Sequence, residues 1–211
     1  GITHIHVDLT QQYEDLLASV RAYDKTIDEP ANAIRRGNLR VRSRMLTVYN
    51  IASMEKGLVG STDNFSELAA GFWTLHGDVG DVGPIQSLTK SWEVPKLAEM
   101  YGVPASTVFA TPTDGLGFSQ SDEHQFGFSY LEFDIALLSY MQLNVSEKAD
   151  FGTVLGALQP DSVSTQERLQ NILKRVQMST FKRSNPYNLP HPTQNQRYSG
   201  LQTLDTALWT K

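Results

Sequence analysis

The stretch that decides the fold is Gly60-Ser-Thr-Asp-Asn-Phe-Ser-Glu67, and Gly71-Phe-Trp-Thr-Leu-His-Gly-Asp78 follows it closely. The short apolar run from Leu58 to Gly60 predicts a buried strand, and the apolar residues from Phe65 to Trp73 recur at helical spacing. In open α/β sheets, ligands bind where strands end and helices begin, because free N–H groups at a helix N-terminus favour anions. Polar side chains at this junction therefore predict a nucleotide or metal–phosphate site.

Asn64 and Glu67 also have a structural interpretation. A helix N-cap followed three residues later by Glu is the pattern of a capping box, in which the carboxylate accepts a hydrogen bond from the backbone of the cap residue. Taken alone, these two residues favour the capping role. A ligand site becomes the better interpretation only in the context of the longer sequence.

Apolar periodicity along the chain predicts an α/β fold with an open, mostly parallel sheet and helices on both faces. The expected helices cover approximately residues 13–20, 38–55, 65–73, 94–101, 130–141 and 166–177. The second of these is apolar nearly all round from Met45 to Ile51, which predicts that it is buried. Ile5–Leu9 alternates like a half-buried strand, but two strands are too few for such a sheet. We therefore expect N-terminal strands of the domain to be missing from the chain.

The chain of 211 residues is long enough for one domain, which we place at residues 1–183, with an irregular tail at 184–211. The long irregular segment Thr111–Gln125 is a candidate lid. The absence of cysteine excludes disulfides and thiolate metal sites and fits a cytoplasmic protein. The sequence has no apolar run of about 18 residues, so we expect no membrane association.

Charge argues against nucleic acid as a partner. Residues 61–150 carry three basic and thirteen acidic side chains, whereas binding to a phosphate backbone needs clustered Lys and Arg. The basic residues lie before and after this region, and a small phosphate-bearing ligand is the more suitable partner for such flanks.

Five segments in order carry a resemblance to a known family. They are Arg36-Gly-Asn-Leu-Arg-Val-Arg-Ser-Arg-Met45, the two segments quoted above, Pro84-Ile-Gln-Ser-Leu-Thr-Lys90 and Thr111-Pro-Thr-Asp-Gly-Leu116. Together they resemble the NAD synthetases, ammonia-using enzymes of the ATP-pyrophosphatase type, over about the first two-thirds of the chain. One segment alone would be a weak signal, but five at compatible spacings are a strong one.

The resemblance implies a ligase that uses ATP and Mg²⁺ to convert deamido-NAD and ammonia to NAD through an adenylated intermediate, releasing AMP and pyrophosphate. It also implies a homodimer. Carried over residue by residue, it assigns ATP contacts to Thr62, Lys90 and Thr113, deamido-NAD contacts to Arg42, Asp81 and Lys182, and a magnesium ligand to Glu67.

Several features depart from the family. The Ser-Gly-Gly-x-Asp-Ser loop that wraps the ATP pyrophosphate in family members is not in the sequence, and we expect it to lie upstream. Leu75 stands where the family usually has Lys, and Phe181 where it often has His. Thr113 also suits an ordinary turn before Gly115. Two alternatives therefore stay open: a related ATP-pyrophosphatase acting on another substrate, and a non-catalytic remnant that still binds nucleotide.

Overall fold

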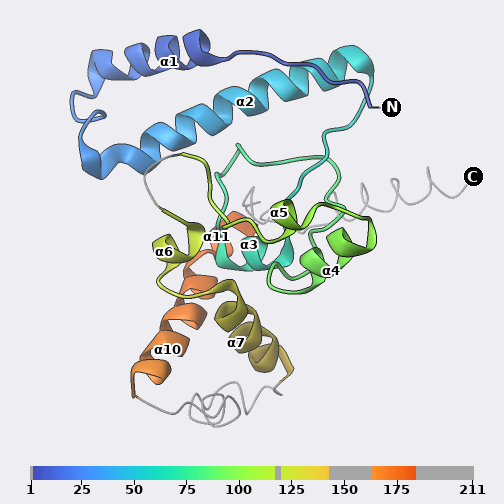
Figure 1. Ribbon diagram of the computed structural model, residues 1–211. Helices are drawn as coiled ribbons and strands as arrows, with labels where there is room; N and C mark the ends of the chain where they lie inside the picture. Colours follow the sequence, from blue (N-terminus) through green and yellow to red (C-terminus); the bar gives the residue numbers. More distant parts are fainter. Residues whose placement is uncertain (1, 117–119, 143–162, 184–211) are drawn as a thin grey trace, which may run out of the picture.

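A computed structural model describes residues 2–116, 120–142 and 163–183. These residues form three helical groups, with α1 and α2 side by side at one end, α7 and α10 at the other, and short helices between them (Figure 1). In chain order the elements are α1 (Thr10–Tyr23), the 3₁₀ turn η1 (Pro30–Asn32), α2 (Ala33–Glu55), α3 (Phe65–Ala70), α4 (Glu93–Met100), α5 (Ala105–Val108), α6 (Asp122–Phe126), α7 (Tyr130–Gln142), α10 (Val163–Met178) and α11 (Thr180–Arg183).

The long amphipathic helices appear where the sequence predicts them. Helices α1, α2, α4, α7 and α10 each cover the predicted range with small differences at the ends. Gly102 follows α4 with a φ of 69° and stops the helix. None of the described helices is long and apolar enough to cross a membrane. The predicted tail at residues 184–211 lies outside the described part of the chain.

The predicted burial of the Met45–Ile51 stretch is wrong for the single chain. Leu46 is 56% exposed and Val48 is 46% exposed, while Val41, one turn earlier, is buried. The reason is that α2 packs against α1 with one face only. Apolar density within a helix does not show whether the same chain covers each of its faces.

The expected open sheet is not formed by the described residues. Ile5–Leu9 is not a strand: the segment has no β partner in this part of the chain, and Ile5 is 57% exposed. Of the run Leu58–Gly60, only Gly60 makes a β-type contact, an isolated parallel bridge to Val82. Alternating apolar residues specify a strand only when a neighbouring strand supplies backbone partners. No backbone hydrogen bond joins residues 2–9 to residues 57–62 within the described part of the chain.

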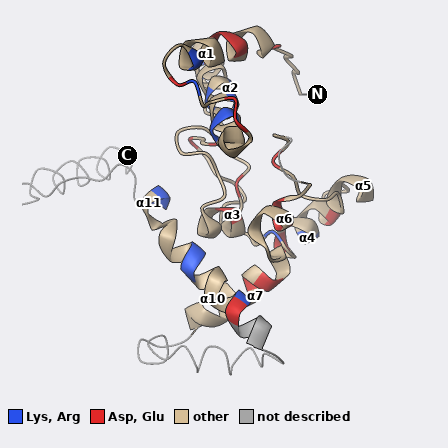
Figure 2. Ribbon diagram, turned by 90° about the vertical axis from the view of Figure 1, so that its left-hand side faces the viewer, with Lys and Arg blue, Asp and Glu red and all other residues tan. Residues whose placement is uncertain are grey.

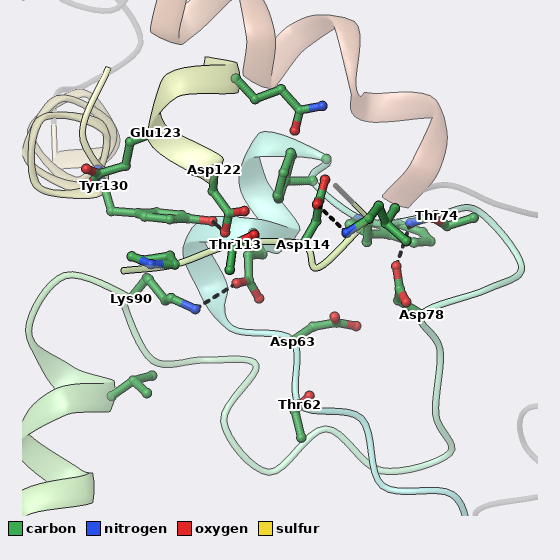
Figure 3. Close-up of a pocket in the computed structure, with 18 of the residues that line it drawn as sticks. Thr62, Asp63, Thr74, Asp78, Lys90, Thr113, Asp114, Asp122, Glu123 and Tyr130 are labelled. Carbon is green, nitrogen blue, oxygen red and sulfur yellow. Dashed lines mark hydrogen bonds and ion pairs between the residues drawn. The ribbon is translucent and has the colours of Figure 1, made fainter. Parts of the chain in front are cut away.

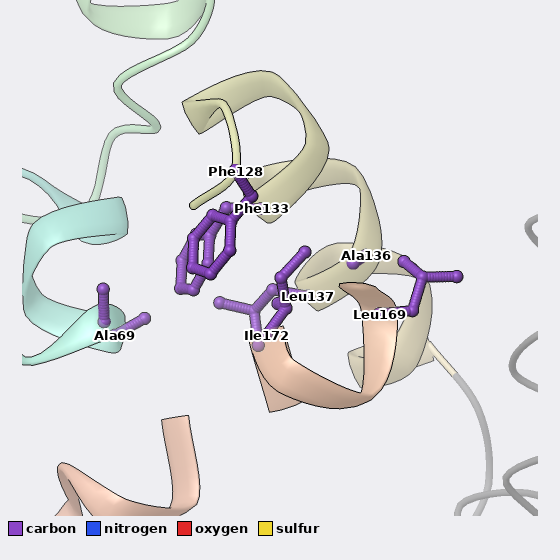
Figure 4. Packing of buried hydrophobic residues seen from close by; sticks show 8 residues of the cluster. Ala69, Phe128, Phe133, Ala136, Leu137, Leu169 and Ile172 are labelled. Atoms are coloured by element: carbon purple, nitrogen blue, oxygen red, sulfur yellow. The ribbon is translucent and has the colours of Figure 1, made fainter. Parts of the chain in front are cut away.

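The main core lies where α3, α7 and α10 meet (Figure 4). Phe133 and Ile172 are 1% exposed, and Phe128 stacks on Phe133 with ring centroids 5.7 Å apart. Deletion of one such buried side chain typically costs about 2–5 kcal/mol. The core therefore fixes α3, which carries the central motif, against two helices from the second half of the chain.

Helix α3 ends earlier than predicted, because Gly71 adopts a left-handed conformation with a φ of 64°. Its N–H and that of Phe72 close the helix by donating to the carbonyls of Leu68 and Glu67. A Cβ on Gly71 would lie 2.3 Å from the Cβ of Ser179. Glycine is therefore required here both for its backbone conformation and for the close approach of the α10–α11 junction.

We predict that Gly71→Ala destabilises the protein by roughly 2–4 kcal/mol, because left-handed strain adds to a clash with Ser179. Gly102→Ala is the matched control: Gly102 has a similar φ but nothing within 4 Å of an added Cβ. Its cost should be only about 1 kcal/mol. Urea unfolding of both variants measures the difference, and equal costs would show that the contact with Ser179 has no energetic role.

Candidate functional site

A large cavity, of about 1270 Å³, opens between α2, α3, the loop after α3 and the segment from Lys90 to Tyr130. Pockets for drug-sized ligands usually measure about 300–1000 Å³, so this one has room for a large ligand. Six of the seven residues singled out from the sequence line it, namely Arg42, Thr62, Glu67, Lys90, Thr113 and Lys182. Figure 3 shows its interior.

Glu67 forms the capping box and also lines the cavity. Its Oε2 accepts a hydrogen bond from the N–H of Asn64 at 3.2 Å, and Asn64 Oδ1 accepts one from the N–H of Glu67 at 3.0 Å. The capping box is therefore formed. Meanwhile Oε1 faces the cavity and lies 3.1 Å from Lys90 Nζ. The cap uses one carboxylate oxygen and leaves the other to the site.

Lys90 lines the cavity beside Glu67 and Tyr130. Besides its ion pair with Glu67, its Nζ lies 5.6 Å from the ring centre of Tyr130. Burial raises the pKa of the Tyr130 hydroxyl, and the negative charge of Glu67 adds to this rise. The phenol is therefore neutral and serves as a hydrogen-bond donor, to Asp122 Oδ2 at 3.2 Å.

Asp63 and Asp122 are two cavity carboxylates that sequence analysis did not single out. Burial raises the pKa of both. Repulsion from Glu67 and Asp78 raises that of Asp63 further, against the hydrogen bond donated by Ser61. Asp122 is only 5% exposed, and within the described part of the chain its Oδ1 has no hydrogen-bond partner. Asp63 stands within the quoted motif and so was accessible to sequence analysis, whereas Asp122 carried no local signal.

Arg42 reaches the cavity from α2. Its Nε donates to the carbonyl oxygen of Leu75 at 3.1 Å. Nearby, Thr74 Oγ1 donates to Asn38 Oδ1 at 2.8 Å and thereby ties the same loop to α2. The position where the family usually has a lysine side chain, Leu75, thus contributes a backbone carbonyl that orients Arg42.

Lys182 reaches the cavity from α11. Its Nζ donates to the carbonyl oxygens of Gly71, at 2.6 Å, and Trp73, and lies 5.4 Å from the Trp73 ring centre. Burial lowers the pKa of Lys182 and the charge of Arg175 lowers it further, while Asp78 opposes them. An ammonium group has three donors, so one remains for a ligand.

Asp81 is the one predicted site residue that does not line the cavity. Its Oδ2 accepts a hydrogen bond from the backbone N–H of Val59 at 2.9 Å, so it supports the chain just before the central motif. Asp78, three residues earlier, lines the cavity instead, and its Oδ2 accepts a hydrogen bond from the N–H of Thr74 at 3.0 Å. The predicted substrate contact of Asp81 thus finds no support in its position.

The predicted lid, Thr111–Gln125, forms one wall of the cavity over its described residues; residues 117–119 are outside them. Thr113 Oγ1 accepts a hydrogen bond from the N–H of Gly115 at 3.2 Å, as a turn former does, while also facing the cavity. The N–H of Asp122 donates to the Pro112 carbonyl at 3.0 Å. This contact joins the two ends of the segment, and opening of a lid stays a prediction.

Charge is distributed unevenly over the helices (Figure 2). Cationic side chains reach the cavity from α2, from α10–α11 and from the loop that precedes α4; they are Arg42, Arg44, Lys90, Arg175 and Lys182. The carboxylates of Asp63, Glu67, Asp78, Asp114, Asp122 and Glu123 lie among them. Such a mixed lining suits a polyanion that binds together with a cation.

Comparison with known proteins agrees with this geometry. The chain is 41% identical over 138 residues to an NH₃-dependent NAD⁺ synthetase of Alkaliphilus metalliredigens, covering 64% of this chain and 56% of that protein. It is 31% identical over 190 residues to one of Thermoplasma acidophilum, covering 90% and 68%, and 34% identical over 142 residues to one of Chlorobium phaeovibrioides, covering 62% and 51%. The chain thus spans about half the length of several curated relatives that it matches.

Solved structures give the same fold. An NMN synthetase from Francisella tularensis superposes with a TM-score of 0.66 at 24% identity, over 90% of this chain and 67% of that one. An NAD⁺ synthetase from Burkholderia pseudomallei superposes with a TM-score of 0.55 at 26% identity, over 85% and 60%. The family model for NAD synthase matches residues 5–186. The chain belongs to the NAD synthase family.

Proposed function

We propose that this chain provides the nucleotide and substrate cavity of an NAD synthetase, which forms NAD from deamido-NAD, ATP and ammonia. The observation that carries the proposal is the convergence of Thr62, Glu67, Lys90 and Thr113 on one cavity, although they come from three separate parts of the sequence. Family membership, with relatives named for this reaction, supports it further.

The reaction needs an activated carboxyl group. A carboxylate oxygen of the nicotinate ring attacks the α-phosphorus of ATP, and pyrophosphate leaves. The ammonia nitrogen then attacks the carboxyl carbon and releases a proton to solvent, and AMP leaves with the electron pair of the broken C–O bond. Both steps develop negative charge, which fixed cations stabilise. We assign this role at the ATP end to Lys90, and at the deamido-NAD end to Arg42 and Lys182.

The carboxylates of the cavity fit Mg²⁺. Among the described residues no three His, Cys, Asp or Glu side chains gather closely enough to hold a metal by themselves. Mg²⁺ is, however, commonly bound by one or two carboxylates together with substrate phosphates. Burial raises the pKa of Asp63, and repulsion from Glu67 and Asp78 raises it further, so carboxylates are crowded at this part of the cavity. We assign Glu67 and Asp63 as ligands; bound there, the ion would neutralise phosphate charge.

The wider assignments rest on separate observations. The match at residues 5–186 supports treating residues 1–183 as one NAD synthetase-like domain. The exposed apolar side chains of Leu46 and Val48 on α2 support a homodimer in which a second copy covers them. The cysteine-free sequence supports a cytoplasmic location.

The direct test measures NAD and AMP formation from deamido-NAD, ATP and ammonia by the protein as its gene encodes it, and ATP binding by the 211-residue chain. We expect both products in equal amounts, dependent on Mg²⁺. Turnover of a different carboxylate would favour a related ATP-pyrophosphatase. ATP binding without AMP formation would favour the non-catalytic alternative.

Glu67→Gln should lower Mg²⁺-dependent AMP formation by about 100-fold or more, because the charge that holds the cation is lost. The fold should be kept, since an amide oxygen still accepts the hydrogen bond from Asn64. Glu93→Gln is the matched control: Glu93, the first residue of α4, accepts a hydrogen bond from Thr89 N at 2.7 Å, and it does not line the cavity. Normal turnover by Glu67→Gln would leave Glu67 with a capping role only.

Asp63→Asn should stabilise the unliganded protein at pH 7 and weaken Mg²⁺-dependent ATP binding. The folded protein raises the pKa of Asp63 above its ordinary value of 3.8. The charged form therefore destabilises the fold at neutral pH, and the penalty vanishes below pH 3.8, where both states are protonated. The increase in the free energy of unfolding caused by Asp63→Asn, measured by urea unfolding at several pH values, should disappear as the pH falls.

Asp24→Asn is the control, for which we expect a change in the free energy of unfolding opposite in sign to that of Asp63→Asn. Hydrogen bonds from Thr26 and then Arg35 lower the pKa of Asp24 to about 2. Its stabilisation is present above pH 3.8 and is lost as the pH falls toward 2. Asp24→Asn should therefore destabilise the protein at pH 7. The same sign for both variants would contradict the charge assignment of Asp63.

A further inference from the structure

A fully buried carboxylate lies behind the cavity wall. Asp134 on α7 has no exposed surface, and neither has Ser66 on α3. Asp134 Oδ1 accepts a hydrogen bond from Ser66 Oγ at 2.5 Å. Asp134 Oδ2 accepts two more, from Ser91 N at 3.1 Å and Ser91 Oγ at 2.6 Å. Neither Asp134 nor Ser66 lines the cavity, so neither contacts a ligand.

These hydrogen bonds hold the backbone on both sides of Lys90. The N–H of Lys90 donates to Ser66 Oγ at 2.9 Å, and the N–H of Ser91 donates to Asp134. Just before them, the carbonyl of Leu88 accepts the N–H of Phe65 at 2.8 Å. The Lys90 side chain therefore starts from a backbone that is fixed to α3 and α7 together, and Glu67 is one residue away from Ser66 on the same helix.

We infer that Asp134 is a positioning residue for the proposed ATP site: through Ser66 and Ser91 it sets the distance between Lys90 and Glu67. The inference rests on the proposed function. A carboxylate is required because all three groups that meet it are donors, and an amide would present its own N–H₂ to one of them. If that group turned to Ser66 Oγ, which already accepts the Lys90 N–H, the hydroxyl hydrogen would lose its acceptor.

The test uses the 211-residue chain with ATP and Mg²⁺. Asp134→Asn should weaken ATP binding by about 10-fold or more, because a small displacement of a charged contact has an effect of this size or larger. It should also speed hydrogen exchange at the backbone amides of Lys90 and Ser91, measured by NMR. Ser91→Ala should act in the same direction, and Ser91→Thr, which keeps the hydroxyl, should restore both properties.

Glu132→Gln controls for general effects of substitutions in α7. Glu132 accepts a hydrogen bond from Ser129 N at 2.8 Å at the start of the same helix, pairs with Arg168 at 2.8 Å and does not line the cavity. Glu132→Gln should leave ATP affinity and hydrogen exchange at the Lys90 and Ser91 amides unchanged. Faster exchange in Asp134→Asn with unchanged ATP affinity would overturn the positioning role.

Failure of the proposed function gives a different result. If the cavity is not an ATP site, the unmodified chain does not bind ATP at all, whereas the exchange measurement still reports on the backbone of Lys90. ATP binding without NAD formation would contradict only the assigned reaction and leaves the positioning test intact. Unchanged exchange at Lys90 and Ser91 in both Asp134→Asn and Ser91→Ala would overturn the inference, whatever the affinity for ATP.

Discussion

The cationic side chains that meet the carbonyl end of α3 hold the site together. Arg183 donates to the carbonyls of Leu68 and Ala69, at 3.2 and 2.7 Å, and Arg175 donates to Ala70 at 3.1 Å. The last carbonyls of a helix have no partner within the helix and carry partial negative charge, so cations stabilise them. A helix of only six residues is marginal by itself. These contacts fix it from more than a hundred residues away.

This arrangement explains why the site is assembled from both ends of the chain. The capping box fixes the N-terminal end of α3, and α10–α11 fix its C-terminal end. Lys182 belongs to the same group of cations and reaches the cavity because its neighbours are held on the helix end. The cavity thus gains Glu67 from this short helix and Arg175 and Lys182 from segments held against its end, while α2 supplies Arg42 and Arg44.

The sequence predicts a feature correctly where the pattern is local. It predicts incorrectly where the outcome depends on which other segment packs against the residues. The capping box at Asn64 and the period of α7 and α10 are local, and both are present. Suitable apolar residues are present in both Ile5–Leu9 and Met45–Ile51. A strand, however, needs a neighbouring strand for its hydrogen bonds, and a buried helix face needs another segment packed against it. Which of Asp78 and Asp81 faces the cavity depends on the path of the intervening turn, where Gly80 packs against Ser61. The spacing of residues along the sequence does not determine that path.

The division of Glu67 between two tasks has a thermodynamic consequence. One oxygen closes the first turn of α3 and the other faces the cavity, so a ligand that draws the carboxylate outward competes with the end of the helix. Fraying of α3 and ligand occupancy are then linked equilibria, each shifting the other by the same free energy. A solution condition that stabilises the helix terminus would change affinity without any new contact to the ligand. An aspartate side chain at this position, one methylene shorter, could not both accept the capping hydrogen bond and reach Lys90.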